Sequence, residues 1–232
     1  MLPALELVSI IKEYHGLRPL RVRRLVVSAG EVVALEGLDA AAAEALTNLV
    51  TGATVPEQGT VRVLGADTTS IANADEWLTS LDRFGIVSDR VALVDALTVR
   101  QNVAIALTLD LDPLPDEVNA RVAALAAEVG LAPGDLDVPA ANAAPAARFR
   151  ARVARAIALS PRVILGEHPT GSLPRVDVPR AALDFFRLVR DRGLAVLLTT
   201  ADREFSAAAD RHLVLDLKSG AVRGRGFRPW FR

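Results

Sequence analysis

Hydrophobic and polar residues alternate along the segments LELVSIIKEY and LRVRRLVVSAGEVVAL, at residues 5–14 and 20–35. A period of two is typical of β-strands that bury one face. Both segments therefore predict strands, with a turn at 28–30 that divides the second segment. A further short strand is expected between Gly59 and Gly65.

Three short apolar runs follow later in the chain: FGIVSD, RVILGE and LAVLLTT. Such runs are typical of strands that are buried on both faces, as in a parallel sheet covered by helices. Helical periodicity separates them, and proline or glycine marks several helix ends. The expected helices lie at 73–83, 98–109, 115–130, 148–159, 179–193 and around 203–209, and a final hairpin lies at 212–224. The pattern predicts an α/β fold with a mostly parallel sheet and a helical insertion.

Composition narrows the class of protein only slightly. The 232 residues are 51% hydrophobic and 24% charged, which fits one large α/β domain or one core with a smaller subdomain. A net charge of −1 gives no reason to expect a nucleic-acid partner. The absence of cysteine excludes disulfides and thiolate metal sites. The N-terminus lacks a signal-peptide pattern and no apolar run approaches the roughly 18 residues that span a bilayer, so a soluble chain is expected.

One stretch, VVALEGLDAAAAEALTNLVTG at Val32–Gly52, has the layout of a phosphate-binding strand, loop and helix. Its loop, however, carries four consecutive alanines. Alanine is the best helix former, and Asp39 just before the run is a favoured N-cap. We predict that the helix begins near Ala40, with the Asp39 carboxylate on its first amides, where a phosphate would otherwise lie.

Several blocks, taken in order, resemble the ATPase subunit of an ABC transporter over nearly the whole chain. They are GEVVALEG, LTNLVTG, TVRQNVAIAL, RVARAIALSPRVIL, HPTGSL and ADRHLVLDLKSGAV. The sequences of these blocks are most similar to those of the family branch that serves lipoprotein-release, macrolide-export and cell-division permeases. The resemblance implies a P-loop NTPase-like ABC ATPase fold: a mostly parallel core with an antiparallel β subdomain at 1–88 and 161–232, and an inserted α-helical (signature) subdomain at 89–160.

The residues of the phosphate loop depart from the family pattern. Only Gly37 remains of its glycines, which let backbone amides converge on phosphate. Ala43 stands where the resemblance implies the phosphate-binding lysine, and Glu44 where it implies the hydroxyl that holds magnesium. Asp39 and Glu44 would then repel a nucleotide, by roughly 4 kcal/mol for two unit charges about 4 Å apart near a surface.

Other family positions are altered in the same way, and one is kept. Tyr14 matches the aromatic residue on which adenine stacks. The replacements are Asp89 for the glutamine that senses phosphate, Glu167 for the magnesium-binding aspartate, His168 for the glutamate that polarises water, Pro174 for a loop aspartate, Ala201 for the switch histidine, and Ala143, Ala144, Pro145, Ala146 and Ala147 for the signature segment.

Simpler interpretations compete with each of these features. Gly37 with the alanine run could be an ordinary strand-to-helix turn, and Tyr14 a packed or surface aromatic. Glu167 and His168 could form an acid–base pair, but a satisfied structural histidine at a strand end is favoured. Pro145 is expected to punctuate a loop before a helix that begins near Ala147. The histidines show no ligand spacing, so no metal is expected. The tail RGRGFRPWFR could touch lipid headgroups or a permease, or could be a frayed terminus.

Three functions follow as hypotheses. The favoured one is a catalytically degenerate cassette subunit that pairs with an intact ABC ATPase subunit and a transmembrane permease, at the cytoplasmic face of the membrane. Such a chain would bind ATP-Mg at most weakly, or through its partner, and would not hydrolyse it. Its cleft around Asp89–Leu97 would receive the permease. The alternatives are a soluble regulatory or scaffold pseudo-ATPase, and a weak nucleotide binder or enzyme with relocated chemistry around Glu167 and His168.

Overall fold

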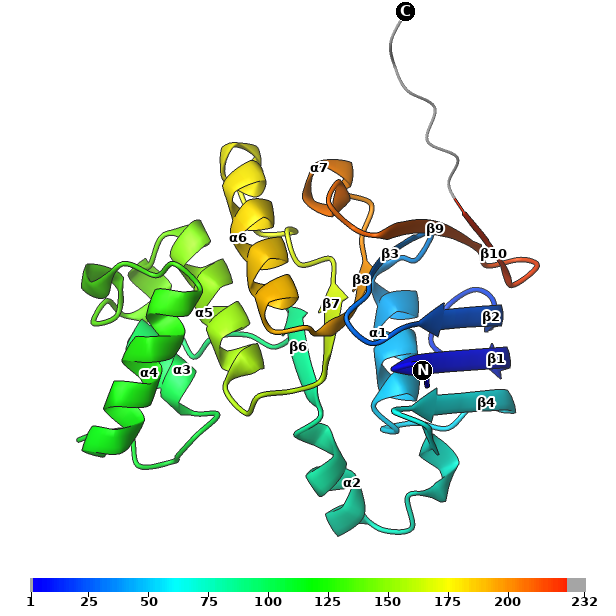
Figure 1. Ribbon diagram of the computed structural model, residues 1–232, viewed down its shortest axis with the longest axis horizontal. Coiled ribbons are helices and arrows are strands. Elements are labelled where there is room, and N and C mark those ends of the chain that lie inside the picture. The colour runs from blue at the N-terminus through cyan, green and yellow to red at the C-terminus, as the bar shows by residue number, and fades with distance from the viewer. Residues whose placement is uncertain (1, 225–232) are drawn as a thin grey trace, which may run out of the picture.

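A six-stranded sheet forms the centre of the protein in a computed structural model that describes residues 2–224 (Figure 1). The strand order is β10-β9-β3-β8-β7-β6. All neighbours are parallel except β10, which pairs antiparallel with β9 at one edge. The strands are β3 (Val32–Glu36), β6 (Phe84–Ser88), β7 (Val163–Glu167), β8 (Ala195–Thr199), β9 (Arg211–Asp216) and β10 (Ala221–Gly224). The expected mostly parallel core is confirmed.

A second, four-stranded sheet has the order β2-β1-β4-β5 and is antiparallel throughout. Its strands are β1 (Leu5–Lys12), β2 (Leu20–Val27), β4 (Gln58–Val63) and β5 (Ala66–Asp67). Helix α1 (Ala40–Val50) lies between the two sheets, and its apolar residues pack with both (Figure 1). The antiparallel β subdomain is therefore confirmed as well.

The remaining helices lie mainly on the other side of the central sheet. Helices α3 (Val99–Ala104), α4 (Asp116–Glu128) and α5 (Pro145–Ile157) form the helical insertion, at the left of Figure 1. The others are α2 (Ala74–Leu81), α6 (Val178–Asp191), α7 (Arg203–Ser206) and the single-turn 3₁₀ helices η1 (Thr68–Ser70), η2 (Pro133–Asp135), η3 (Ala140–Asn142) and η4 (Arg175–Asp177).

Several helix boundaries differ from the sequence predictions, those of α5 and α3 among them, and α7 ends at Ser206, three residues before the expected end. Helix α5 begins at Pro145, two residues before the expected start, so Pro145 opens the helix rather than punctuating a loop. The reason is that proline lacks the amide hydrogen that the first helical residue leaves free, and its fixed φ suits that position. Helix α3 ends at Ala104, whereas the expected helix continued to residue 109.

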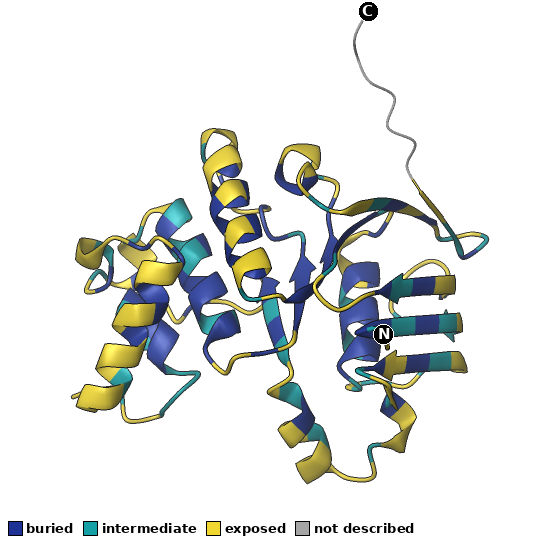
Figure 2. Ribbon diagram, viewed as in Figure 1, coloured by how far each residue is buried: buried dark blue, intermediate teal, exposed yellow. Residues whose placement is uncertain are grey.

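Two hydrophobic cores share the central sheet, and strand β8 shows how (Figure 2). Val196 and Leu198 belong to the core beneath α5, α6 and the helical insertion. Ala195 and Leu197 belong to the core around α1 and the antiparallel sheet. Successive side chains of a strand point to opposite faces, so a strand between two cores must be apolar at every position. This explains the uniformly apolar runs in the sequence.

No helix within residues 2–224 is long and apolar enough to cross a membrane. The aromatic-basic tail that could contact lipid or permease begins with Arg223 and Gly224 in β10, and its remaining residues, with Arg225, Arg228, Trp230, Phe231 and Arg232, lie outside the described residues.

Candidate functional site

The loop between β3 and α1 contains Gly37, the one glycine that the family pattern retains. Its φ is +99°, and a Cβ built on it would lie 2.3 Å from the main-chain oxygen of Leu215 in β9. Both observations exclude any larger residue, because other side chains rarely adopt this φ and the oxygen occupies the space. The packing of this loop against β9 therefore requires Gly37, whether or not a ligand binds.

Asp39 caps the first turn of α1, as predicted. Its Oδ1 accepts a hydrogen bond of 2.8 Å from the Ala42 amide, and its main-chain oxygen accepts one of 2.9 Å from Ala43. Helix α1 begins at Ala40, where the alanine run predicted it. The carboxylate satisfies one of the free amides of the helix N-terminus, and it places a negative charge at the end of the helix where anions otherwise bind.

The next two positions of α1 lie in different surroundings. Ala43, where the resemblance implies a lysine, is completely buried in the core between the two sheets. Glu44, where the resemblance implies a hydroxyl, keeps a side chain that is 45% exposed. At Ala43 the helix therefore supplies packing instead of a positive charge.

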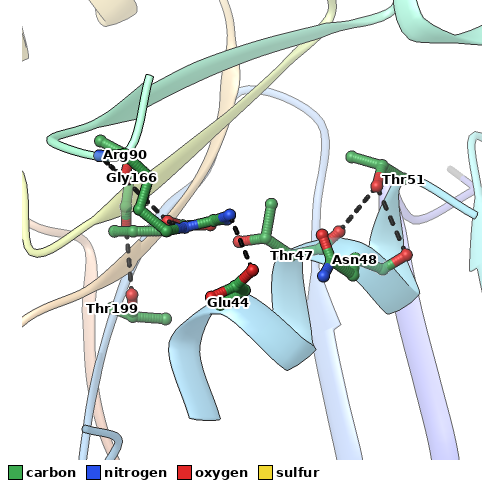
Figure 3. Close-up of polar contacts among 9 residues, drawn as sticks. Glu44, Thr47, Asn48, Thr51, Arg90, Gly166 and Thr199 are labelled. Carbon is green, nitrogen blue, oxygen red and sulfur yellow. Dashed lines mark hydrogen bonds and ion pairs between the residues drawn. The ribbon is translucent and has the colours of Figure 1, made fainter. Parts of the chain in front are cut away.

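Arg90, two residues beyond the end of β6, joins α1 to β7 (Figure 3). Its Nη1 lies 3.0 Å from Glu44 Oε1, and its Nε and Nη2 donate to the two oxygens of Glu167 at 2.8 and 2.6 Å. The second contact is a two-pronged guanidinium–carboxylate pair, the strongest form of side-chain ion pair.

Arg90 is not among the site residues that the sequence predicted. Glu44 was expected to repel a nucleotide together with Asp39, and its ion pair with Arg90 offsets part of its negative charge. The signal that could have found the pair is the arginine directly after Asp89, at the end of a strand that is parallel to β7. In a parallel sheet the carboxyl ends of neighbouring strands meet at one edge, which brings Arg90 and Glu167 together.

Glu167 ends β7 with a side chain that is only 5% exposed. Burial on its own raises the pKa of its carboxyl, but hydrogen bonds from Arg90, Thr47 and Ser88 outweigh burial and lower the pKa overall. The hydrogen bond to Glu167 in turn raises the pKa of Arg90. Both groups are therefore charged near neutral pH, and each stabilises the charge of the other.

His168, which follows β7, is not the satisfied histidine that the sequence predicted. Its Nε2 is buried without a hydrogen-bond partner, and its φ of +42° is unusual for this residue. Its amide donates to the Thr199 oxygen at 2.8 Å. Both carboxylate oxygens of Glu167 are already bonded to Arg90, so this geometry does not favour an acid–base pair between Glu167 and His168.

Asp89, the neighbour of Arg90, points to a different element. It forms an ion pair with Arg152 of α5, and it accepts a hydrogen bond of 3.0 Å from Ser172. Arg155 of α5 donates to the main-chain oxygen of Ala92 at 3.1 Å. The segment after β6 is thus tied to the helical insertion by Asp89 and to the core by Arg90.

The remaining family positions offer no side-chain hydrogen-bonding group. Ala201 lies exposed after β8, and Ala144 is the N-cap of α5 without a side-chain hydrogen bond. Ala143, Ala146 and Ala147 flank Pro145 at the start of α5, and Pro174 precedes η4. The side chains at these positions can contact a partner only by van der Waals packing.

Tyr14 lines a pocket of about 370 Å³ beside the first half of α1, together with Glu44 and Asn48. Burial, and then the negative charge of Asp39, raises the pKa of the Tyr14 hydroxyl. The structure therefore brings Tyr14, Asp39 and Glu44 to one side of α1. A flat aromatic group could stack in such a pocket, but the carboxylates of Glu13 and Glu44 line it.

Comparison with known proteins agrees with this fold. A family profile described as ABC transporter matches residues 20–171. The chain is 30% identical over 202 residues to ABC transporter ATP-binding protein YtrE of Bacillus subtilis, covering 86% of this chain and 85% of YtrE. It is 27% identical over 225 residues to lipoprotein-releasing system ATP-binding protein LolD of Alcanivorax borkumensis, covering 95% of this chain and 97% of LolD.

Among solved structures, the dimeric bacterial ABC transporter cassette MJ0796 has the same fold, with a TM-score of 0.77 at 22% identity. The match covers 96% of this chain and all of that one. With the profile match over more than half of the sequence, these findings show that the chain belongs to the ABC transporter family, as an ATP-binding cassette.

Proposed function

We propose that this chain is a non-hydrolysing cassette subunit, which supports a transporter complex through its architecture rather than by turning over ATP. The observation that carries the proposal is the start of α1, where the Asp39 carboxylate bonds the Ala42 amide at 2.8 Å and Ala43 is buried. A cassette binds the phosphates of ATP with free amides and a lysine at this place. Here the amide is already satisfied and the positive charge is missing.

The charge at the start of α1 disfavours a bound phosphate. A helix N-terminus attracts anions because its amides are free and its dipole is positive there. A carboxylate on those amides repels a phosphate, by roughly 4 kcal/mol for unit charges about 4 Å apart near a surface. ATP-Mg therefore binds this chain at most weakly, or through a partner subunit.

The positions that would activate water also support a chain that does not hydrolyse ATP. The family resemblance assigns this role to the places of His168 and Ala201. The alanine has no group that can hold or move a proton, and the His168 Nε2 is buried. The carboxylate beside it, Glu167, is engaged by Arg90. No catalytic residue is therefore assigned to this chain.

The partners follow from the family and from the altered positions. The solved relative MJ0796 is dimeric, and the relative LolD is named for a lipoprotein-releasing system. In this chain both the phosphate loop and the signature segment are altered, so two copies would build no competent site. We infer that it pairs with an intact ATPase subunit and a permease, at the inner face of the membrane.

The permease contact is assigned to the segment Asp89–Leu97. Val94 in this segment is 47% exposed, whereas Leu93 is only 6% exposed and packs into the core beneath the helical insertion. Val91 is also partly exposed, at 36%. The apolar side chains that a permease would meet are therefore Val91 and Val94, and not Leu93.

The test is to measure ATP turnover and ATP-Mg affinity with the isolated chain. We expect no turnover above a protein-free control, and a Kd weaker than about 100 μM, which corresponds to roughly −5.5 kcal/mol. YtrE purified in the same way serves as the comparison protein. Turnover at the rate of an intact cassette would overturn the proposal. Binding tighter than about 100 μM without turnover would instead favour the alternative of a nucleotide-binding chain, whose supporting feature is the pocket beside Tyr14.

A further inference from the structure

We propose that Arg90 is the built-in cation of the site between α1 and β7, and that it excludes a divalent metal ion from this site. The inference deepens the proposed function, because a cassette that hydrolyses ATP needs a metal ion there. It rests on the proposed function only for the location of the site. Its test uses metal without nucleotide and is therefore independent of any measurement of turnover.

Arg90 already uses the carboxylate oxygens that a metal ion would need. Glu167 Oε1 accepts from Arg90 Nη2 at 2.6 Å, and Oε2 accepts from Arg90 Nε and Ser88 Oγ, both at 2.8 Å. Glu44 Oε1 accepts from Arg90 Nη1 at 3.0 Å (Figure 3). One guanidinium thus engages the two carboxylates that face each other across the site.

The main chain of Arg90 is also held in place, by a hydrogen bond. Its amide donates to Ser88 Oγ at 3.1 Å, and the same hydroxyl donates to Glu167 at 2.8 Å. Ser88 itself is 3% exposed. A side chain whose main chain and planar head are both fixed loses little further freedom when it pairs, so the arrangement is pre-organised.

Mg²⁺ and the Arg90 guanidinium differ in the ligands that they require. Mg²⁺ requires near-octahedral oxygen ligands at roughly 2.0–2.1 Å, and it gives up its water reluctantly. To bind between Glu44 and Glu167 it would have to displace the guanidinium into solvent, and it would gain only two carboxylates and a hydroxyl in exchange. Within residues 2–224 no group of three or more histidine or acidic side chains is arranged to hold a metal ion. The residues present therefore do not fit Mg²⁺ while Arg90 is in place.

Ion pairs of Asp89 and Arg90 hold the connection between the core and the helical insertion. Asp89 is bound to Arg152 of α5, and the adjacent Arg90 is bound to Glu167 of β7. Charges that belong to the chain itself thus hold this junction, so its conformation does not depend on a bound metal or nucleotide.

The experiment titrates Mn²⁺ alone, followed by the electron paramagnetic resonance signal of the free ion. The wild-type chain is expected to show no site that depends on Glu167. The Arg90→Gln variant leaves Glu44 and Glu167 without their cation, and it is expected to bind Mn²⁺ at least tenfold more tightly than the wild type. Adding Glu44→Gln and Glu167→Gln to Arg90→Gln should abolish the gain. Arg83→Gln, at an exposed arginine just before β6, is the matched control and should behave as the wild type.

Two results would overturn the inference: Mn²⁺ binding by the wild type that is lost in Glu167→Gln, or a folded Arg90→Gln variant that binds Mn²⁺ no better than the wild type. If Arg90→Gln does not fold, the side-chain Nε–H resonance of Arg90 in the wild type decides. Its position should not change when Mg²⁺ is added, and a shift or loss of this resonance contradicts the proposal.

Discussion

Asp89 and Arg152 form an ion pair across the junction between the central sheet and the helical insertion. Arg152 is 8% exposed, and its burial lowers the pKa of its guanidinium despite the opposing effect of Asp89. Ser172 bonds both partners, at 3.0 Å to Asp89 and 2.9 Å to Arg152. A buried cation in this position needs its counter-charge, because an unpaired buried charge is costly.

Asp89→Asn should therefore destabilise the protein by about 2 kcal/mol, the scale of a hydrogen bond to a charged group. The measurement is urea unfolding, with hydrogen exchange of residues 89–95, which should become faster. Asp95→Asn is the matched control. Its carboxylate is 70% exposed and pairs with Arg148 at the surface, so its removal should change stability by less than about 1 kcal/mol. Equal effects of the two substitutions would contradict the assignment.

Asp39 offers a test that separates capping from charge. Asp39→Ala removes the hydrogen bond to the Ala42 amide and should destabilise the protein by about 1 kcal/mol. Asp39→Ser keeps a capping oxygen without the negative charge, so stability should be retained while the affinity for ATP rises. Thermal unfolding measures the first effect and calorimetric titration the second. An ATP affinity that is equal in the wild type and in Asp39→Ser would show that the carboxylate does not repel phosphate.

The lowered pKa of Glu167 predicts a dependence of stability on pH. Because its folded-state pKa lies below the ordinary value of 4.5, the unfolded state binds more protons in this range. The stabilisation is therefore complete above about pH 4.5 and is lost as the pH falls through the folded-state pKa. Urea unfolding from pH 7 to pH 3 should show this loss in the wild type but not in Glu167→Gln. The other carboxylates with a lowered pKa titrate in both proteins and cancel in the difference; they are Glu31, Glu57, Glu128, Asp137, Asp202 and Asp216.

The proposed permease surface predicts different results at adjacent positions. Val94→Glu places a charge on an exposed side chain, so the chain should fold normally but no longer copurify with the permease of its native complex. Leu93→Glu places a charge in the core and should lower stability by several kcal/mol, because a charge cannot be buried unpaired. Val176→Glu, at a position that is 83% exposed in η4, controls for a new surface charge. Normal copurification of Val94→Glu would move the interface elsewhere.

Local features could be predicted from the sequence because they depend on neighbouring residues. The start of α1 follows from Asp39 and the alanine run, and the buried strands follow from apolar runs between two cores. Pro145 was misplaced because proline suits both a loop and the first residue of a helix. The subdomain boundaries at 89 and 160 stay a prediction.

The polar contacts of the site could not be predicted in the same way. Arg90 reaches residues 46 and 77 positions away, and Arg152 pairs across 63 positions. Such pairs depend on strand order and on rotamers, which no local pattern contains. The buried, unpartnered Nε2 of His168 has no sequence signal either, because the lack of a partner is a property of the packed structure.

The close approach of Gly37 to Leu215 has a consequence for comparing cassettes by sequence. The sheet packing demands this glycine whether or not phosphate binds, so its presence says nothing about activity. A search that weights this glycine heavily would group a non-hydrolysing cassette, such as we propose for this chain, with working ones. The residue six positions later, a lysine in one group and a buried alanine here, is the better criterion for sorting them.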